Sequence, residues 1–441
     1  MSGQRSGFQT FLIVWVGQLI SVTGSTITGF GLAIWVYLET DSVTLLAVLT
    51  LAASVPGMAA TPFAGPLVDR MDRRRVMLLA DSAAGLATMV AALLYFTGNL
   101  EVWHIYPIAA AGSIANAFQE PAYLASVPLL VPKAHIGRAN GMIQLGPAIG
   151  TIAAPALAGV LVLIAGIGAV LLVDMVTFII AVSTLLAVRI PRPAPSAEAS
   201  DAGEPLLKGF ARAWRYLRER PGLFGFLLMA AVLNFILGFA NVLYLPLLLS
   251  FSNEAAAGGI MSIAGVGMLV GSVVMSAWGG PKRRVPGMLA FMAVSGVAVS
   301  LTGIRESVPL VAASVFLLMA TVAIINGTSQ ALWQVKISPD MQGRVFSVRR
   351  LLAQFAAPIS YLLAGPLADS VFEPALADDG LLAGSVGSLI GTGPGRGIGF
   401  AFVLMGAATV FVALVTYARP HIRNLELVLP DMIGEPVPAE A

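Results

Sequence analysis

A short charged segment separates two long apolar stretches near the start of the chain. It reads Gly65-Pro66-Leu67-Val68-Asp69-Arg70-Met71-Asp72-Arg73-Arg74-Arg75 and holds two acids and four arginines. A charge cluster of this kind cannot enter hydrocarbon, so it marks a membrane surface and fixes an orientation. Each flanking stretch is long enough to cross a bilayer. The segment therefore predicts a chain built from membrane-spanning helices.

The composition extends this prediction to the whole chain. The 441 residues are 57% hydrophobic and 11% charged, whereas soluble domains are about one quarter charged. There is no cysteine, which excludes disulfides, zinc–thiolate sites and cysteine nucleophiles. The three histidines, His104, His135 and His421, have no metal-ligand spacing. We expect an all-α membrane protein without a metal or a cofactor.

Apolar runs of sufficient length recur along the chain. A membrane-spanning helix needs ~20 mostly apolar residues, and on this criterion the sequence predicts twelve transmembrane helices. Their expected positions are about 8–38, 43–68, 76–98, 103–131, 139–165, 168–188, 223–250, 256–278, 285–304, 307–335, 343–368 and 397–418.

The basic residues give this layout an orientation. With the N-terminus inside, 23 of the 25 lysines and arginines fall on the inner segments or the inner ends of the spans, and Arg305 and Arg396 do not. Basic residues concentrate on the cytoplasmic side of membrane proteins. We therefore expect both termini in the cytoplasm.

A change in composition divides the chain between the sixth and seventh spans. Residues 190–222 are expected to form a cytoplasmic linker that includes an amphipathic helix, at 206–219, on the inner leaflet. This places one six-helix bundle in residues 1–189 and a second in residues 223–418. Residues 419–441 are more polar, and we expect a disordered cytoplasmic tail.

Short repeats relate the two halves. Ala64-Gly65-Pro66-Leu67-Val68-Asp69, at the end of the second span, is echoed by Ala364-Gly365-Pro366-Leu367-Ala368-Asp369, at the end of the eleventh. With three-helix units, the first two units have opposite orientations, which is the construction of many secondary transporters. The prediction is two pseudo-symmetric bundles.

Polar and aromatic residues recur at helical spacing in the first helix of each expected unit. Residues four and seven positions apart share one face of a helix, so four such faces would together line a water-reachable, amphipathic cavity. Hydrogen bonding between helices is the alternative role of these side chains. The predicted cavity residues are Gln18, Ser25, Asn116, Glu120, Tyr123, Asn234, Asn241, Asn326, Gln330 and Trp333.

Three acidic residues, Asp81, Glu120 and Asp174, fall inside the expected spans. Glu120 is closest to mid-depth, and an ionisable residue there is a functional hypothesis by default. We expect Glu120 to carry a coupling proton or to pair with a cationic substrate; a structural role is the alternative. Asp174 is the second candidate for the proton, although helix packing or capping is favoured for it. Asp81 is expected to pair with an arginine of the charged segment.

The charged segment also resembles the signature loop between helices 2 and 3 of major facilitator superfamily transporters, G-x-L-x-D-R-x-G-R-[RK]. Asp72 stands where the pattern has its second glycine. The resemblance favours a conformational latch, in which Asp69 meets the start of the eleventh span at Arg344; the alternative is that the segment only sets topology. The positions that match the pattern are Gly65, Leu67, Asp69, Arg70, Arg73 and Arg74, and the predicted latch comprises Gly65, Asp69, Arg70, Arg73 and Arg344.

Further motifs resemble the branch of this superfamily that includes macrolide-efflux proteins and the enterobactin exporter. They are Leu130-Val131-Pro132, Gly137-Arg138-Ala139-Asn140-Gly141 and Arg215-Tyr216-Leu217 before Pro221.

The resemblance implies proton-driven export of an amphipathic small molecule from a bacterial inner membrane by alternating access. The expected partners are this substrate, protons and the lipid bilayer, with no nucleic acid, and the protein is expected to be a monomer. We find no catalytic cluster and no phosphate-binding loop with its lysine, so we expect no enzyme. A siderophore exporter of the same fold is one alternative, and a lipid-handling or sensory membrane protein is another.

Overall fold

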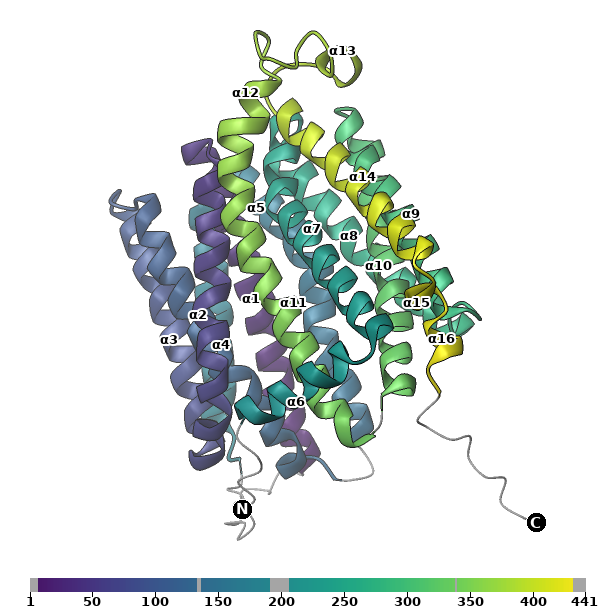
Figure 1. Ribbon diagram of the computed structural model, residues 1–441. Coiled ribbons are helices and arrows are strands. Elements are labelled where there is room, and N and C mark those ends of the chain that lie inside the picture. The colour runs from purple at the N-terminus through teal and green to yellow at the C-terminus, as the bar shows by residue number, and fades with distance from the viewer. Residues whose placement is uncertain (1–6, 133–135, 191–205, 338, 431–441) are drawn as a thin grey trace, which may run out of the picture. The chain divides into compact units, whose positions relative to one another are not determined.

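The computed structural model describes residues 7–132, 136–190, 206–337 and 339–430, and these parts of the chain contain helices and no strand (Figure 1). They form two compact units. The first unit comprises Met1–Ala197 and Leu248–Ser262, and the second comprises Glu198–Leu247 and Ile263–Ala441.

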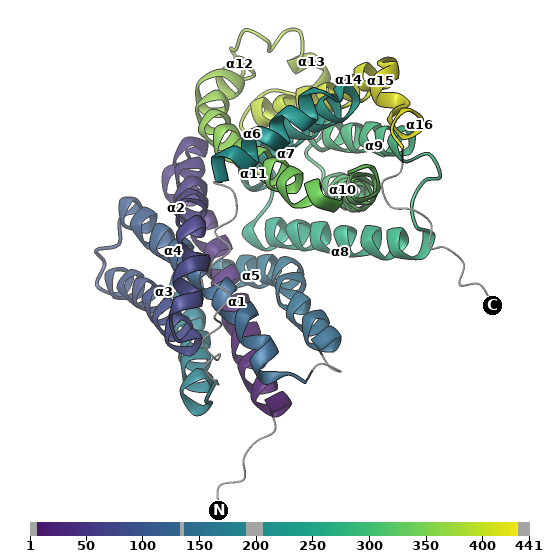
Figure 2. The ribbon, with the colours of Figure 1, turned by 60° about the horizontal axis from the view of Figure 1, so that its bottom comes forward.

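Five helices build most of the first unit. Helix α1 packs along α5, and both α2 and α3 pack against α4 (Figure 2). An apolar core lies among them and includes the fully buried side chains of Phe11, Met77 and Leu185. The helices are α1 (Gly7–Thr40), α2 (Val43–Arg70), α3 (Arg73–Phe96), α4 (Val102–Leu130) and α5 (Ile136–Ala187).

Helix α5 contains two predicted spans joined at a bend. Gly166 interrupts the helical backbone with φ 70° and ψ −178°, a conformation that is essentially restricted to glycine. The predicted spans at 139–165 and 168–188 lie on either side of this residue. The 52-residue helix is thus two membrane-length arms that meet at Gly166.

The second unit contains the remaining helices. Helix α9 packs against α10 and α14, and α6 packs against α11. The elements are α6 (Leu206–Arg218), α7 (Pro221–Phe251), α8 (Glu254–Trp278, its first turns grouped with the first unit), α9 (Arg284–Ile304), α10 (Val308–Lys336), α11 (Pro339–Leu367), a π-helix (Ala368–Phe372), α12 (Glu373–Ala375), α13 (Gly387–Ile390), α14 (Arg396–Ala418), α15 (Pro420–Arg423) and α16 (Leu425–Val428).

The predicted spans coincide closely with these helices. Among the described residues, ten helices are long and apolar enough to cross a membrane. One of the ten, Ala148–Ala187, contains the bend at Gly166. Helix α4 lies at the predicted fourth span but is not among the ten.

The charged segment forms a tight connection between α2 and α3. Asp72 is the N-cap of α3, where its Oδ1 accepts hydrogen bonds from the backbone N–H of Arg74 at 3.0 Å and Arg75 at 3.4 Å. The residue that departs from the glycine of the family pattern therefore has a structural role, because a cap satisfies N–H groups that lack a partner within the helix.

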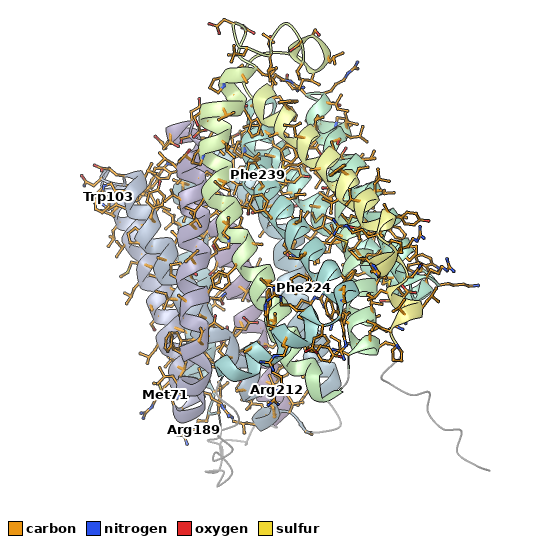
Figure 3. The ribbon with its side chains drawn as sticks, viewed as in Figure 1. Met71, Trp103, Arg189, Arg212, Phe224 and Phe239 are labelled. Atoms are coloured by element: carbon orange, nitrogen blue, oxygen red, sulfur yellow. The ribbon has the colours of Figure 1, made fainter. Side chains whose placement is uncertain are left out.

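Arg74 fastens this connection to the end of α5. Its guanidinium donates to the backbone oxygens of Leu185 at 2.8 Å and Leu186 at 3.0 Å. A cation is favourable at a helix C-terminus because the last carbonyls carry partial negative charge. Figure 3 shows Met71 and Arg189 at one end of the first unit and Trp103 at the other.

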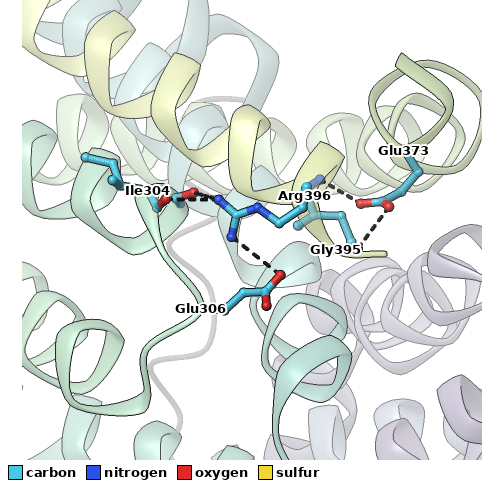
Figure 4. Close-up of polar contacts among 7 residues, drawn as sticks. Ile304, Glu306, Glu373, Gly395 and Arg396 are labelled. Carbon is cyan, nitrogen blue, oxygen red and sulfur yellow. Dashed lines mark hydrogen bonds and ion pairs between the residues drawn. The ribbon is translucent and has the colours of Figure 1, made fainter. Parts of the chain in front are cut away.

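A buried arginine ties together one end of the second unit. Arg396, 3% exposed, donates to the backbone oxygens of Gly303 at 3.1 Å and Ile304 at 3.0 Å (Figure 4). Its other terminal nitrogen lies 3.7 Å from a carboxylate oxygen of Glu306. These contacts fix the start of α14 to the C-terminus of α9.

Glu373 holds the same end of α14 from another direction. Its carboxylate accepts hydrogen bonds from the backbone N–H of Gly395 at 3.0 Å and of Ile398 at 2.8 Å. A carboxylate is favourable there because the N-terminus of a helix carries partial positive charge. At this end of the second unit, the side chains of Arg396 and Glu373 thus hold the C-terminus of α9 and the N-terminus of α14 in place.

One prediction about the second unit is corrected by the structure, and another stays open. The tail predicted to be disordered forms α15 and α16 in its described part, with Ile422 and Leu425 buried in the core. The amphipathic helix is present as α6, and its Ala213 and Leu217 pack into the same core. Its place on the inner leaflet stays a prediction. In both cases the apolar side chains of these short helices pack against the apolar side chains of the core. Residues 191–205 and 431–441 lie outside the described residues.

Candidate functional site

Asp174 lies in the interior of the first unit with hydroxyl groups as partners. Its side chain is 6% exposed. One carboxylate oxygen accepts a hydrogen bond from Thr88 Oγ1 of α3 at 2.7 Å, and the other accepts one from Ser25 Oγ of α1 at 3.3 Å. The second arm of α5 is therefore joined to α1 and α3 through one acid.

Asp81 forms a second polar contact in the same interior. Its Oδ2 accepts a hydrogen bond from Gln18 Nε2 at 3.1 Å, and Gln18 Oε1 accepts one from Gln119 Nε2 at 2.7 Å. Asp81 is 7% and Gln18 is 4% exposed. The chain of contacts runs from α3 through α1 to α4.

The two contacts lie on the same faces of α1 and α3. Gln18 and Ser25 are seven residues apart on α1, and Asp81 and Thr88 are seven residues apart on α3, a rise of about 10 Å along each helix. The predicted spacing on α1 is thus used to contact two buried acids.

Neither acid has a cationic partner among the described side chains. The predicted pairing of Asp81 with an arginine is wrong, since Arg74 binds the end of α5 instead. A buried carboxylate without a cation is costly in its charged form. Both acids therefore sit where gaining or losing a proton would change the local free energy substantially.

The predicted residues of α4 lie in a different environment. Glu120 and Asn116 are exposed in the first unit. Tyr123 is partly buried, and its hydroxyl has no hydrogen-bond partner among the described residues. The roles of these residues in a cavity or in proton coupling stay predictions.

A cavity of about 270 Å³ lies wholly within the second unit. Its walls come from α7, α9, α10, α11 and α14 and are mostly apolar, and they include Phe226 and the three methionines Met229, Met288 and Met292. Polar atoms come from Asn234, Ser295, Asn326, Ser329, Arg349 and Thr409. Such a mixture suits an amphipathic molecule, because apolar area supplies affinity and a few polar groups fix orientation.

Arg349 supplies the charge of this cavity. Its NH1 donates to Gln330 Oε1 at 2.9 Å, and its NH2 donates to Ser329 Oγ at 3.3 Å. The guanidinium carbon lies 5.7 Å from the ring centre of Trp333, a distance that permits a cation–π interaction.

The predicted residues of the second unit are thus placed in different ways. Asn234 and Asn326 line the cavity, while Gln330 is exposed and binds the arginine. Trp333 is fully buried in the apolar core, and Asn241 is exposed.

Most of the predicted latch cannot be placed. The side chains of Gly65, Asp69, Arg70 and Arg344 lie outside the described residues. Arg73 is partly buried, and its Nε has no hydrogen-bond partner among the described residues. The latch stays a prediction.

The sequence matches a known protein family over most of its length. A family model described as Major Facilitator Superfamily matches residues 14–361. The chain belongs to this superfamily. It is therefore a multi-pass membrane transporter of small molecules rather than an enzyme, and similar efflux proteins are bacterial.

Relatives in this superfamily carry efflux names. Macrolide efflux protein A of Streptococcus pyogenes is 26% identical over 428 residues, which cover 95% of this chain and 97% of the relative. Multidrug efflux pump Tap of Mycolicibacterium fortuitum is 23% identical over 359 residues, which cover 79% of this chain and 86% of the relative.

Solved structures share the fold at lower identity. A bacterial homolog of the human lysosomal transporter Spinster gives a TM-score of 0.66 at 15% identity and covers 95% of this chain and 97% of its own. The nucleoside transporter NupG gives a TM-score of 0.68 at 12% identity and covers 93% of this chain and 98% of its own. These likenesses support the major facilitator fold.

The sequence did not indicate several residues that contact the buried acids of the first unit or line the cavity of the second unit. Gln119 and Thr88 join the buried acids, and Arg349 lines the cavity. The arginine was counted only as a basic residue at the end of a span. Its place ten residues after the start of α11, just before the apolar segment that begins at Phe355, was the available signal, since a charge at the edge of an apolar span needs polar partners.

Proposed function

We propose that the protein is a secondary active exporter of amphipathic small molecules, such as macrolide-like drugs or natural products, driven by protons through alternating access. It would act in the bacterial cell membrane as a monomer with both termini in the cytoplasm. The efflux names of relatives that align along most of the chain support export.

The observation that carries the substrate class is the cavity of the second unit. Methionine side chains are flexible and adapt to differently shaped apolar ligands, and three of them lie in the wall. Asn234 and Asn326 offer both donors and acceptors. This chemistry favours amphiphiles of varied shape over one tightly defined ligand.

Proton coupling is supported by the buried acids of the first unit. Asp81 and Asp174 are held by neutral amide and hydroxyl groups, so a proton can neutralise either one without displacing a cation. Because α1 contributes to both contacts, protonation would alter contacts between helices. We propose these two acids as proton sites, together with Glu120 as predicted from the sequence.

The test is efflux of macrolides and dyes from bacterial cells that lack their own pumps, with and without an uncoupler. We expect the wild type to lower drug accumulation and the uncoupler to abolish this effect. The proton site is identified by loss of efflux in one of three variants, Asp81→Asn, Asp174→Asn and Glu120→Gln. Glu39 is an exposed acid, and Glu39→Gln is the matched control. Efflux that persists with the uncoupler would contradict proton coupling, and unchanged accumulation of every compound would contradict drug export.

A siderophore exporter is the second candidate. The observation in its favour is Arg349 in the cavity wall, because iron-chelating natural products commonly carry acidic oxygen groups that a guanidinium binds well. Accumulation of siderophore in the medium of expressing cells, without drug resistance, would support this candidate over drug efflux.

A further inference from the structure

The second unit places an arginine at the wall of an otherwise mostly apolar cavity. Arg349 belongs to α11 and shares the lining with Met288 and Met292 of α9 and Phe226 of α7. Arg349 is partly buried, and its contact with Gln330 is exposed, so water reaches the guanidinium from one side while the other side faces the apolar cavity. An acidic ligand in the cavity would compensate the charge on that side.

The partners of Arg349 leave its charge uncompensated. Gln330 and Ser329 are neutral and occupy two of the five guanidinium N–H donors. Among the side chains that the structure describes, no carboxylate forms an ion pair with Arg349. Gln330 and the ring of Trp333 hold the guanidinium in position, which reduces the entropy lost when a ligand binds.

We infer that this cavity binds an amphipathic anion, with a carboxylate or a similar acidic group on Arg349 and an apolar chain or ring among the methionines. The inference rests on the proposed export function and narrows its substrate class to acidic amphiphiles, such as the siderophores of the second candidate, rather than macrolides, which carry a basic amine. Arg349 offers the forked geometry that matches a carboxylate, and a cationic amphiphile would meet an unfavourable charge at the same place.

The size of the cavity limits the ligand. Its volume of about 270 Å³ lies just below the ~300–1,000 Å³ of pockets that enclose drug-sized molecules. The cavity therefore accommodates a short amphiphile entirely, or one apolar arm of a larger molecule. A medium-chain fatty acid is a probe of suitable size and charge.

The test measures equilibrium binding of radiolabelled octanoate to the full chain in phosphatidylcholine nanodiscs, with empty nanodiscs subtracted. Octylamine and octanol have the same chain length with a positive and a neutral head group. We expect octanoate to bind more tightly than either. Binding should weaken by about tenfold or more in Arg349→Gln, because a charge-assisted hydrogen bond is lost, and less in Arg349→Lys.

Two further variants separate the site from general effects. Met292→Trp fills the apolar part of the cavity and should abolish octanoate binding with the arginine still present. Arg305→Gln removes an exposed arginine of the same unit and should leave binding unchanged. Size-exclusion profiles and melting temperatures show that each variant is folded, and Arg349→Lys and Met292→Trp decide the question if Arg349→Gln does not fold.

Equal binding of octanoate and octylamine, or octanoate binding that is unchanged in both Arg349→Gln and Met292→Trp, would overturn the inference. Nanodiscs that contain phosphatidylglycerol distinguish the source of the anion: competition with octanoate identifies a lipid head group as the ligand, and its absence identifies a diffusible acid. The measurement needs no proton gradient. Anion binding without export from cells would therefore support the inference and contradict the proposed function. Macrolide export without preferential binding of octanoate would support the proposed function and contradict the inference.

Discussion

In the first unit the buried acids lie within the bundle, where Asp81 and Asp174 bind amide and hydroxyl groups from neighbouring helices. In the second unit the buried arginine, Arg396, lies at one end and binds the backbone (Figure 4). A cavity occupies part of the interior of this unit. A network inside a bundle ties helices to one another and responds to protonation. The contacts of Arg396 hold the ends of α9 and α14 together and leave the interior of the unit free to accommodate a ligand.

The largest expected effect on stability comes from removing the contacts of Arg396. Arg396→Met leaves the backbone oxygens of Gly303 and Ile304 without their donor, and we expect the unfolding free energy to fall by about 3 kcal/mol, as for breaking a buried charged contact. Thermal unfolding of the purified protein in detergent measures it. The neighbouring exposed arginine provides the control Arg305→Met. Equal melting temperatures for the two variants would show that the end of this unit is held by packing alone.

A smaller effect is expected inside the first unit. Thr88→Val removes the 2.7 Å hydroxyl donor of Asp174, and leaving a buried acceptor less satisfied costs about 1–3 kcal/mol. Thr88→Ser keeps the hydroxyl, so its stability and its drug efflux should both be close to those of the wild type. Thr23→Val is the matched control, because that hydroxyl only bonds to the backbone of its own helix. If Thr88→Val and Thr23→Val have the same melting temperature, the network contributes nothing to stability.

The smallest effect is expected in the wall of the cavity. Met292→Leu exchanges side chains of similar volume and should change the unfolding free energy by less than about 1.5 kcal/mol, while the relative efflux of different substrates shifts. Melting temperature and a drug-susceptibility panel, measured on the same variant, check both parts. A large loss of stability would show that the second unit is packed as tightly at this point as the first, and the contrast between the units would fail.

The helices were predictable from the sequence because each membrane span carries its own signal in the length and apolarity of one segment. The predicted span at 285–304 and helix α9 (Arg284–Ile304) agree almost to the residue. The junction at Gly166 was also implied by two apolar runs that meet there.

The partners of polar side chains were predictable only in part. The seven-residue spacing of Gln18 and Ser25 correctly indicated a polar face, but spacing within one helix does not tell which helix faces it. Asp81 lies eight residues after Arg73 along the chain, yet its side chain points to α1. Contacts of this kind depend on helix rotation and packing, which hydropathy does not encode.

Helix α4 has a consequence for how the protein is made. It is the helix at a predicted span that is not among the ten apolar enough to cross a membrane by themselves, and it carries Asn116, Gln119, Glu120 and three prolines. Such a segment partitions poorly into lipid on its own. Since α2 and α3 both pack against it, we expect these two helices, synthesised just before it, to provide the surface on which α4 enters the bilayer during biogenesis.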